Sequence, residues 1–115
     1  MNKFIIVKDS EGFKFRYANI DLHNGLVFKN DKVFGGGMFD LNDEDSVMTL
    51  YGKSDEFGAP RWFDIKRWIE LKKSQEKIHI DEDLKGFTLR WLSGYDDNWD
   101  PIYLDFTDMF VFDWY

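Results

Sequence analysis

The chain has 115 residues, of which 43% are hydrophobic, 19% are aromatic and none is cysteine. This length and composition predict one domain, residues 1–115, with its own hydrophobic core, and they exclude disordered chains, disulfide frameworks and thiol nucleophiles. Acids outnumber bases 22 to 15, so the net charge of −7 argues against nucleic acid as the main partner and favours a protein with a basic surface. The first apolar run, residues 4–7, is too short for a signal peptide or a membrane span, so we expect a cytoplasmic protein without membrane contact.

The first half of the chain has the pattern of short β-strands. Phe13, Phe15 and Tyr17 alternate with Lys14 and Arg16, which is the two-residue period of a strand with one buried face. Turn-rich segments separate the predicted strands, and one of them contains an Asn-Gly pair that favours a tight hairpin. The predicted strands are residues 3–8, 13–20, 26–29, 33–41 and 47–52, with the hairpin at 23–25.

The second half contains one predicted helix, over about residues 60–73. Pro60 suits a first helical turn, and Trp62, Ile65 and Ile69 recur at helical spacing. Residues 78–80, 87–92 and 101–115 return to the alternation of strands. The predicted fold is therefore α+β, with a largely antiparallel sheet and the helix packed on one of its faces.

One segment has the features of an anion-binding loop. Three consecutive glycines, residues 35–37, interrupt a strand pattern, which is tolerated where another group approaches the backbone closely. Residues 51–58 then leave a strand and lead into the helix. Backbone N–H groups in such a loop can line a phosphate, assisted by Lys53, Ser54 and Arg61, whereas Asp55 and Glu56 oppose a second negative charge.

These residues resemble the phosphohistidine phosphatases of the Janus/Ocnus type, which carry a triple glycine, a strand, a loop of this kind and a helix in the same order. The matching motifs are Gly35-Gly36-Gly37, Tyr51-Gly52-Lys53-Ser54 and Phe57-Gly58. The resemblance implies that Ser54 and Glu56 occupy the phosphate-binding positions of the family. Its catalytic histidine aligns with Asn19, whose amide cannot serve as a nucleophile or base, so His23 would have to reach the Ser54 loop instead.

An acidic, aromatic segment lies near the C-terminal end. Residues 96–100 place oxygen side chains at alternate positions, as a calcium loop does, but Pro101 and Thr107 stand where that loop needs a glycine and a bidentate glutamate. We therefore predict an acidic surface turn with no metal, and no other cofactor. Residues 95–115 contain six aspartates and neither lysine nor arginine, which favours attraction to a basic partner.

The leading functional hypothesis is a non-catalytic binding domain that engages a basic protein surface, as inhibitors and immunity proteins do. The predicted contact residues are Tyr95, Asp96, Asp97, Trp99 and Asp100. The alternative is a phosphohistidine-phosphatase-like hydrolase, with phosphate held by Lys53, Ser54, Glu56, Arg61 and His23. Nucleic-acid binding through the basic helix ranks third, because its apolar face is needed for the core. The partner, the substrate and the oligomeric state stay open.

Overall fold

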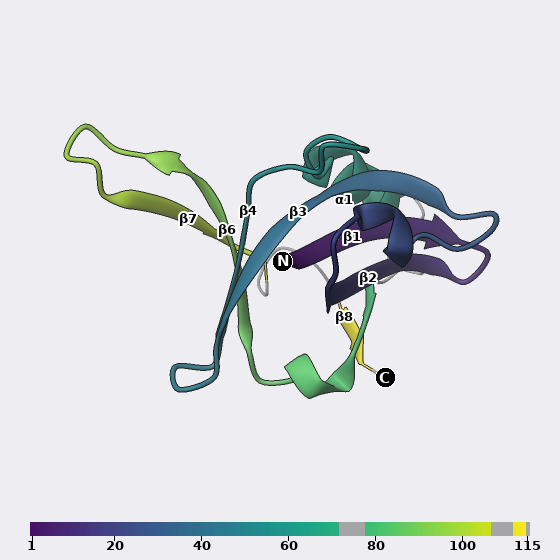
Figure 1. Cartoon of the computed structure of the whole chain (residues 1–115), viewed down its shortest axis with the longest axis horizontal. Helices are drawn as coiled ribbons and strands as arrows, with labels where there is room; N and C mark the ends of the chain where they lie inside the picture. The colour runs from purple at the N-terminus through teal and green to yellow at the C-terminus, as the bar shows by residue number, and fades with distance from the viewer. Residues whose placement is uncertain (72–77, 107–111, 115) are drawn as a thin grey trace.

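The computed structural model describes residues 1–71 and 78–106, and the backbone of residues 112–114. The strands form one curled sheet in the order β7-β6-β4-β3-β1-β2-β5-β8 (Figure 1). The elements are β1 (Asn2–Asp9), β2 (Gly12–Asn19), β3 (Lys32–Asn42), β4 (Val47–Tyr51), α1 (Trp62–Leu71), β5 (Ile78–Ile80), β6 (Thr88–Tyr95), β7 (Pro101–Asp105) and β8 (Phe112–Trp114). Two short 3₁₀-helices, η1 (His23–Leu26) and η2 (Glu82–Leu84), complete the described fold.

The sheet is mixed. The pairs β1–β2, β1–β3, β3–β4 and β6–β7 are antiparallel, whereas β2–β5, β4–β6 and β5–β8 are parallel. The combination of several strands with one α-helix in the described residues confirms the coarse fold class, but the prediction of a largely antiparallel sheet is wrong. The reason is the long connection over residues 52–87, which carries α1 and brings β6 back parallel to β4, as only a long crossover can.

Strand β1 is the centre of the core. Phe4, Ile5, Ile6 and Val7 are fully buried because β1 lies between β3 and β2 and both of its faces are covered. Phe4 and Ile6 face the main core inside the curl, and Ile5 and Val7 face a smaller cluster under η1 that includes Leu26. A strand buried on both faces needs a continuous apolar run, which explains the unbroken sequence at residues 4–7.

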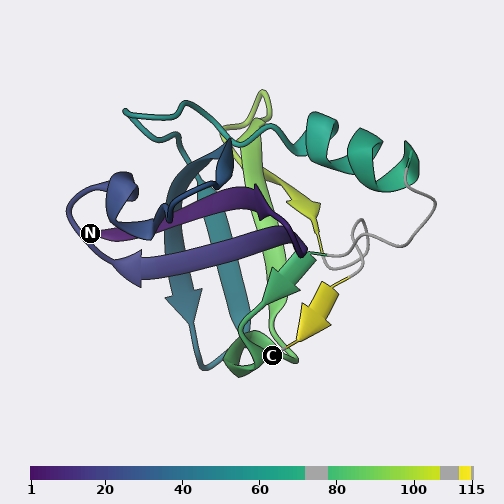
Figure 2. The same ribbon diagram turned by 90° about the vertical axis from the view of Figure 1, so that its right-hand side faces the viewer.

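Helix α1 lies along one end of the curled sheet (Figure 2). It begins at Trp62, two residues later than predicted, and it is described to Leu71, so the end of the predicted helix falls outside the described residues. The amide of Arg61 donates to the Phe34 carbonyl at 2.8 Å, which ties the helix start to β3. Ile65 is buried, and the partly buried Trp62, Trp68 and Ile69 pack against the main core.

Residues 20–31 differ from the prediction of a hairpin followed by a strand. Residues 23–26 form η1, and His23 is buried. Leu26 packs in the cluster beneath β1, while its carbonyl accepts a hydrogen bond from the Arg16 guanidinium at 2.9 Å. Burial of Leu26 and this bond hold the segment against the β1–β2 hairpin, so it cannot extend into a strand.

An ion-pair cluster within the β1–β2 hairpin gives a pH-dependent prediction. Lys14 Nζ lies 2.8 Å from the Asp9 carboxylate, which also accepts the Glu11 amide at 2.8 Å. Burial opposes the charge on Asp9, but the bonds from Lys14 and Glu11 and the charge of Arg16 outweigh it and lower the pKa of this carboxyl. A lowered pKa in the folded state stabilises the fold above the unfolded value of 3.8, and this stabilisation is lost as the pH falls through the folded pKa.

We therefore expect Asp9→Asn to lower the melting temperature at pH 7, and we expect the difference from wild type to shrink as the pH falls through the folded-state pKa of Asp9. Thermal melts across this range measure the difference. The exposed Asp55, replaced by Asn, serves as the control and should follow wild type throughout. If Asp9→Asn lowered the melting temperature as much at acid pH as at pH 7, the result would contradict this role for the Asp9 charge.

Candidate functional site: the β6–β7 arm

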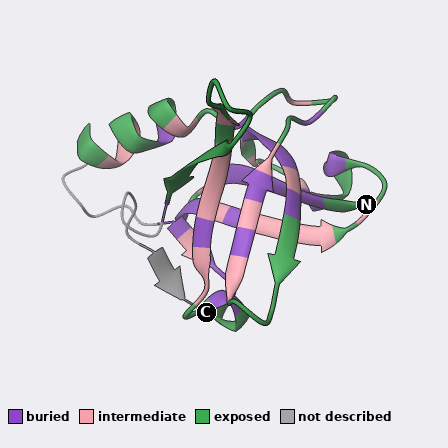
Figure 3. Ribbon diagram, turned by 90° about the vertical axis from the view of Figure 1, so that its left-hand side faces the viewer, coloured by how far each residue is buried: buried purple, intermediate pink, exposed green. Residues whose placement is uncertain are grey.

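Strands β6 and β7 form an antiparallel arm, residues 88–106. Residues 88–91 pair with β4, and the outer part of the arm extends away from the rest of the sheet (Figure 1). Figure 3, which views the molecule from the side of the arm, shows β7 exposed along its length. Ile102 and Leu104 are apolar residues of the alternating pattern predicted for residues 101–115, but they are exposed because the arm projects beyond the body of the domain. Phe106 is buried at its base and donates its amide to the Leu89 carbonyl at 2.8 Å.

The tip of the arm, residues 95–100, is held by a compact set of hydrogen bonds. The Asp96 carboxylate accepts the amides of Asn98 at 2.8 Å and Asp100 at 3.0 Å. The Asp96 carbonyl accepts the Trp99 amide at 3.0 Å, and Trp99 has φ of 64°, in the left-handed region that few side chains other than Asn and Asp adopt. These bonds hold the backbone of Trp99 in a conformation that costs free energy, and such conformations cluster at functional sites.

The five predicted contact residues lie together at this tip. The Trp99 side chain is 80% exposed, and the ring of Tyr95, itself exposed, lies 6.4 Å from it. Asp96, Asp97 and Asp100, in the same turn, are exposed. The tip therefore presents two exposed aromatic rings together with three exposed carboxylates. Tryptophan and tyrosine in such settings are enriched among the residues that dominate protein–protein binding.

A second acidic segment lies on the neighbouring strands, and the sequence reasoning missed it. Residues 38–51, the β3–β4 hairpin, contain Asp40, Asp43, Glu44 and Asp45 and no lysine or arginine. Because β4 pairs with β6, this hairpin and the arm belong to the same four-stranded part of the sheet. The absence of bases was visible in the sequence, but the β4–β6 pairing that joins the two segments was not.

The predicted phosphate-binding residues lie near one another but have structural partners. His23 is 1% exposed and Ser54 is 2% exposed. His23 Nε2 lies 2.8 Å from the Gly37 carbonyl, while Ser54 Oγ accepts the amides of Glu56 at 3.2 Å and Phe57 at 3.1 Å. The loop amides that were expected to hold a phosphate are therefore bonded to the serine that was expected to assist them.

The remaining members of that set also have structural contacts or lie in solvent. The Glu56 carboxylate accepts the Asn24 amide at 3.1 Å, which links the loop to η1. The Arg61 guanidinium donates to the Val33 carbonyl and lies 4.9 Å from the centre of the Phe34 ring. Lys53 is exposed. Phosphate binding here stays a prediction, and the contacts give these residues a role in fixing the loop.

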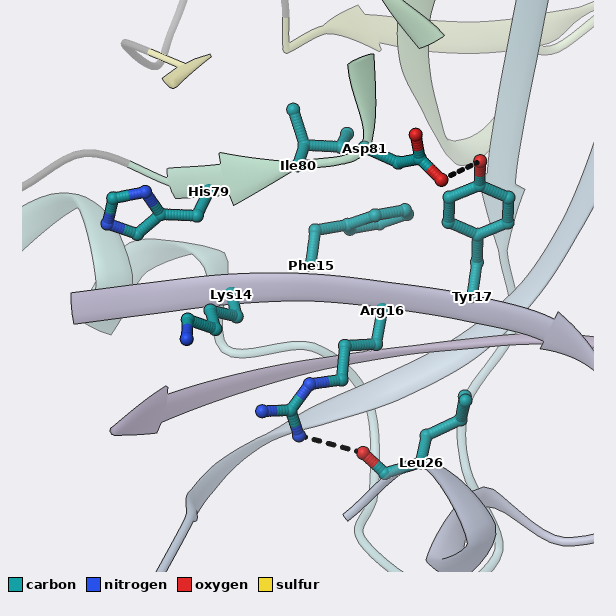
Figure 4. A pocket seen from close by; sticks show the side chains of 8 residues that line it. All are labelled: Lys14, Phe15, Arg16, Tyr17, Leu26, His79, Ile80 and Asp81. Atoms are coloured by element: carbon teal, nitrogen blue, oxygen red, sulfur yellow. Dashed lines mark hydrogen bonds between the residues drawn. The ribbon is translucent and has the colours of Figure 1, made fainter. Parts of the chain in front are cut away.

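A groove of about 560 Å³ lies between β2 and β5 (Figure 4). Its charged groups are largely paired: Arg16 donates to the Asp31 carboxylate at 2.6 Å and to the Leu26 carbonyl. Tyr17 lies 3.5 Å from the Asp81 carboxylate, and burial together with the charges of Asp81 and Asp83 raises the pKa of the Tyr17 phenol. The Tyr17–Asp81 contact links β2 to the end of β5, and the Arg16 contacts link β2 to the segment of residues 26–31, so the groove has few polar groups left for a ligand.

Comparison with protein-family models and with curated proteins finds no match to this chain. Within the described residues, no helix is long and apolar enough to cross a membrane. The same residues contain no cluster of His, Asp or Glu arranged to hold a metal ion. The candidate site therefore rests on the geometry and charge of the arm.

Proposed function

We propose that this protein is a non-catalytic binding domain that engages a protein with a basic surface through the tip of the β6–β7 arm. The observation that carries the proposal is Trp99, which is 80% exposed at the end of a projecting hairpin, in the same turn as the exposed Asp96, Asp97 and Asp100. Exposing a tryptophan to water is unfavourable unless a partner covers it, and the surrounding carboxylates match a surface rich in lysine or arginine.

The electrostatics of the arm support a basic partner. Residues 91–106 include four aspartates and neither lysine nor arginine. Opposite charges on two proteins speed their encounter, and the effect weakens as salt screens it. Exposed tryptophan and tyrosine are also among the residues that most often dominate the binding energy of an interface. We propose an inhibitor-like role, in a reducing cytoplasm that suits a chain without cysteine.

Removal of the three tip charges tests the proposal. Wild type and the triple variant Asp96→Asn, Asp97→Asn, Asp100→Asn are each immobilised and exposed to a cell extract at physiological salt. We expect the variant to lose basic proteins that wild type retains. Asparagine keeps the side-chain oxygen of Asp96 that closes the turn, so the tip should keep its shape. Quantitative mass spectrometry of the retained proteins is the measurement, with an expected loss of at least tenfold for the specific partner.

A matched control separates the effect of losing contacts at the tip from the effect of a smaller net charge on the whole protein. The variant Asp21→Asn, Asp55→Asn, Glu82→Gln removes the same number of charges from exposed positions away from the arm. It should retain the same proteins as wild type. Identical retention by wild type and the tip variant, or equal losses for the tip variant and this control, would refute binding through the tip.

A further inference from the structure

The net charge of the protein is concentrated on four adjacent strands. The β3–β4 hairpin and the arm together carry eight acids and one base, Arg90, and therefore account for all seven net negative charges. The rest of the chain has fourteen acids and fourteen bases. The eight acids are Asp40, Asp43, Glu44, Asp45, Asp96, Asp97, Asp100 and Asp105. The acidic surface proposed to meet the partner is thus wider than the tip and contains one cation near its middle.

A groove of about 500 Å³ runs over these four strands and joins the tip at Tyr95. The strand registers place Asp40 opposite Thr49, Thr49 opposite Arg90, and Arg90 opposite Asp105, in one row across the sheet. The groove is lined by residues of β3, β4, β6 and β7 that include Tyr51, Tyr95 and Tyr103. A segment lying in this groove therefore meets Asp40 and Arg90 in its lining, with Asp105 beside Arg90 in the same row.

The Arg90 side chain is fixed in this groove. Its Nε donates to Thr49 Oγ1 at 2.9 Å, and its Cζ lies 3.8 Å from the centre of the Tyr103 ring. A guanidinium has five N–H groups, and the described residues supply an acceptor for the one on Nε alone. The four N–H groups on the two Nη atoms, held by stacking and by the Thr49 bond, form a preorganised fork of the kind that binds a carboxylate with two parallel hydrogen bonds.

Tyr51 adds a neutral donor to the same groove. Burial and the nearby Asp40 charge raise the pKa of the Tyr51 phenol. The phenol therefore keeps its proton at neutral pH and can donate to an oxygen of a bound segment without adding negative charge.

We propose that this groove receives a segment of the basic partner in which one aspartate or glutamate, flanked by lysines or arginines, pairs with Arg90. The inference rests on the proposed function and names the chemistry of its partner. A free anion is repelled by the surrounding acids, and a segment of lysines alone meets an unpaired Arg90 charge. Only a segment with one acid between bases pairs with Arg90 and is also attracted by the surrounding acids, so Arg90 is a specificity-determining residue.

Three peptides test the pattern directly. Each is an acetylated, fluorescently labelled heptapeptide with two lysines at either end and alanines flanking a central residue, which is glutamate, glutamine or lysine. We expect wild type to bind the glutamate peptide about fivefold more tightly than the glutamine peptide, as an added partly exposed ion pair allows. The lysine peptide should bind more weakly than the glutamine peptide, although its positive charge is greater. Fluorescence anisotropy at low salt measures the three affinities.

Variants of Arg90 test whether this residue causes the preference for the glutamate peptide. Arg90→Gln should remove the preference for glutamate over glutamine, and Arg90→Lys, which keeps the charge and loses the fork, should retain only part of it. Thermal melts establish that the variants are folded. Tightest binding of the lysine peptide, no binding of the glutamate peptide at millimolar concentration, or a glutamate preference that survives Arg90→Gln would overturn the inference. Protein retention by the tip, measured without peptides, would be unaffected by these failures, so the two proposals fall separately.

Discussion

Replacing Trp62 with alanine is expected to destabilise the domain by about 3 kcal/mol, within the range for removing a large aromatic side chain from a core. The Trp62 ring centre lies 4.3 Å from that of Phe106, 5.9 Å from Trp91 and 6.1 Å from Phe4. These residues come from the helix, the arm and the central strand. Loss of the indole therefore leaves a cavity where three separate parts of the chain meet, and surrounding side chains cannot fill it without moving a strand.

Phe63 provides the matched control for this prediction. It is the next residue of the same helix, but it is 81% exposed. Phe63→Ala should change the free energy of unfolding by less than about 0.5 kcal/mol, as is usual for surface positions. Chemical denaturation of both variants gives the comparison. Equal effects of the two substitutions would show that Trp62 does not anchor the helix in the core.

The second large effect is expected at Gly36. A Cβ atom on this residue meets the backbone carbonyl of Phe4, and it lies 3.0 Å from Cδ2 of the buried His23. Gly36 also accepts the Ser54 amide at 3.0 Å and donates to the Gly58 carbonyl at 3.1 Å. We expect Gly36→Ala to cost about 3 kcal/mol, at the upper end of the range for overpacking, because the added methyl must displace the backbone of the central strand.

A second glycine separates this steric effect from the general effect of alanine in a strand. Gly94, in β6, has no atom within 4 Å of its added Cβ. Gly94→Ala should be neutral or slightly stabilising, since alanine restricts the unfolded chain more than glycine does. Equilibrium unfolding in urea compares the two variants. A Gly36→Ala protein as stable as wild type would contradict the close approach of β3 to Phe4.

The elements that depend on local pattern were predictable from the sequence. The alternation of Phe13, Phe15 and Tyr17 gave β2, and the spacing of Ile65 and Ile69 gave α1, because these periods report which face is buried. The parallel return of β6 to β4 was not predictable, since no local feature of either strand records the direction of a non-local neighbour. The predicted hairpin at residues 23–25 was wrong because it also depends on non-local contacts. Asn-Gly favours a hairpin, but burial of Leu26 and the hydrogen bond that its carbonyl accepts from Arg16 outweigh that preference.

The candidate site also has a part that the sequence predicts and a part that depends on strand pairing. The five tip residues are nearly contiguous, so the sequence alone placed them together, and their aromatic and acidic composition made them candidates for a binding site. Asp40 and Arg90 are far apart in the chain and share a row only because β4 pairs with both β3 and β6. For His23 and Ser54, the sequence showed neither whether the two side chains lie close together nor that both are buried, and burial decides whether a ligand reaches them.

Amide hydrogen exchange of the domain, alone and with the partner retained by wild type, tests the central claim most directly, because it reports where the partner lies. The account predicts slower exchange on binding in residues 88–106 and 38–51. Protection confined to residues 20–26 and 53–61, around His23 and Ser54, would contradict it.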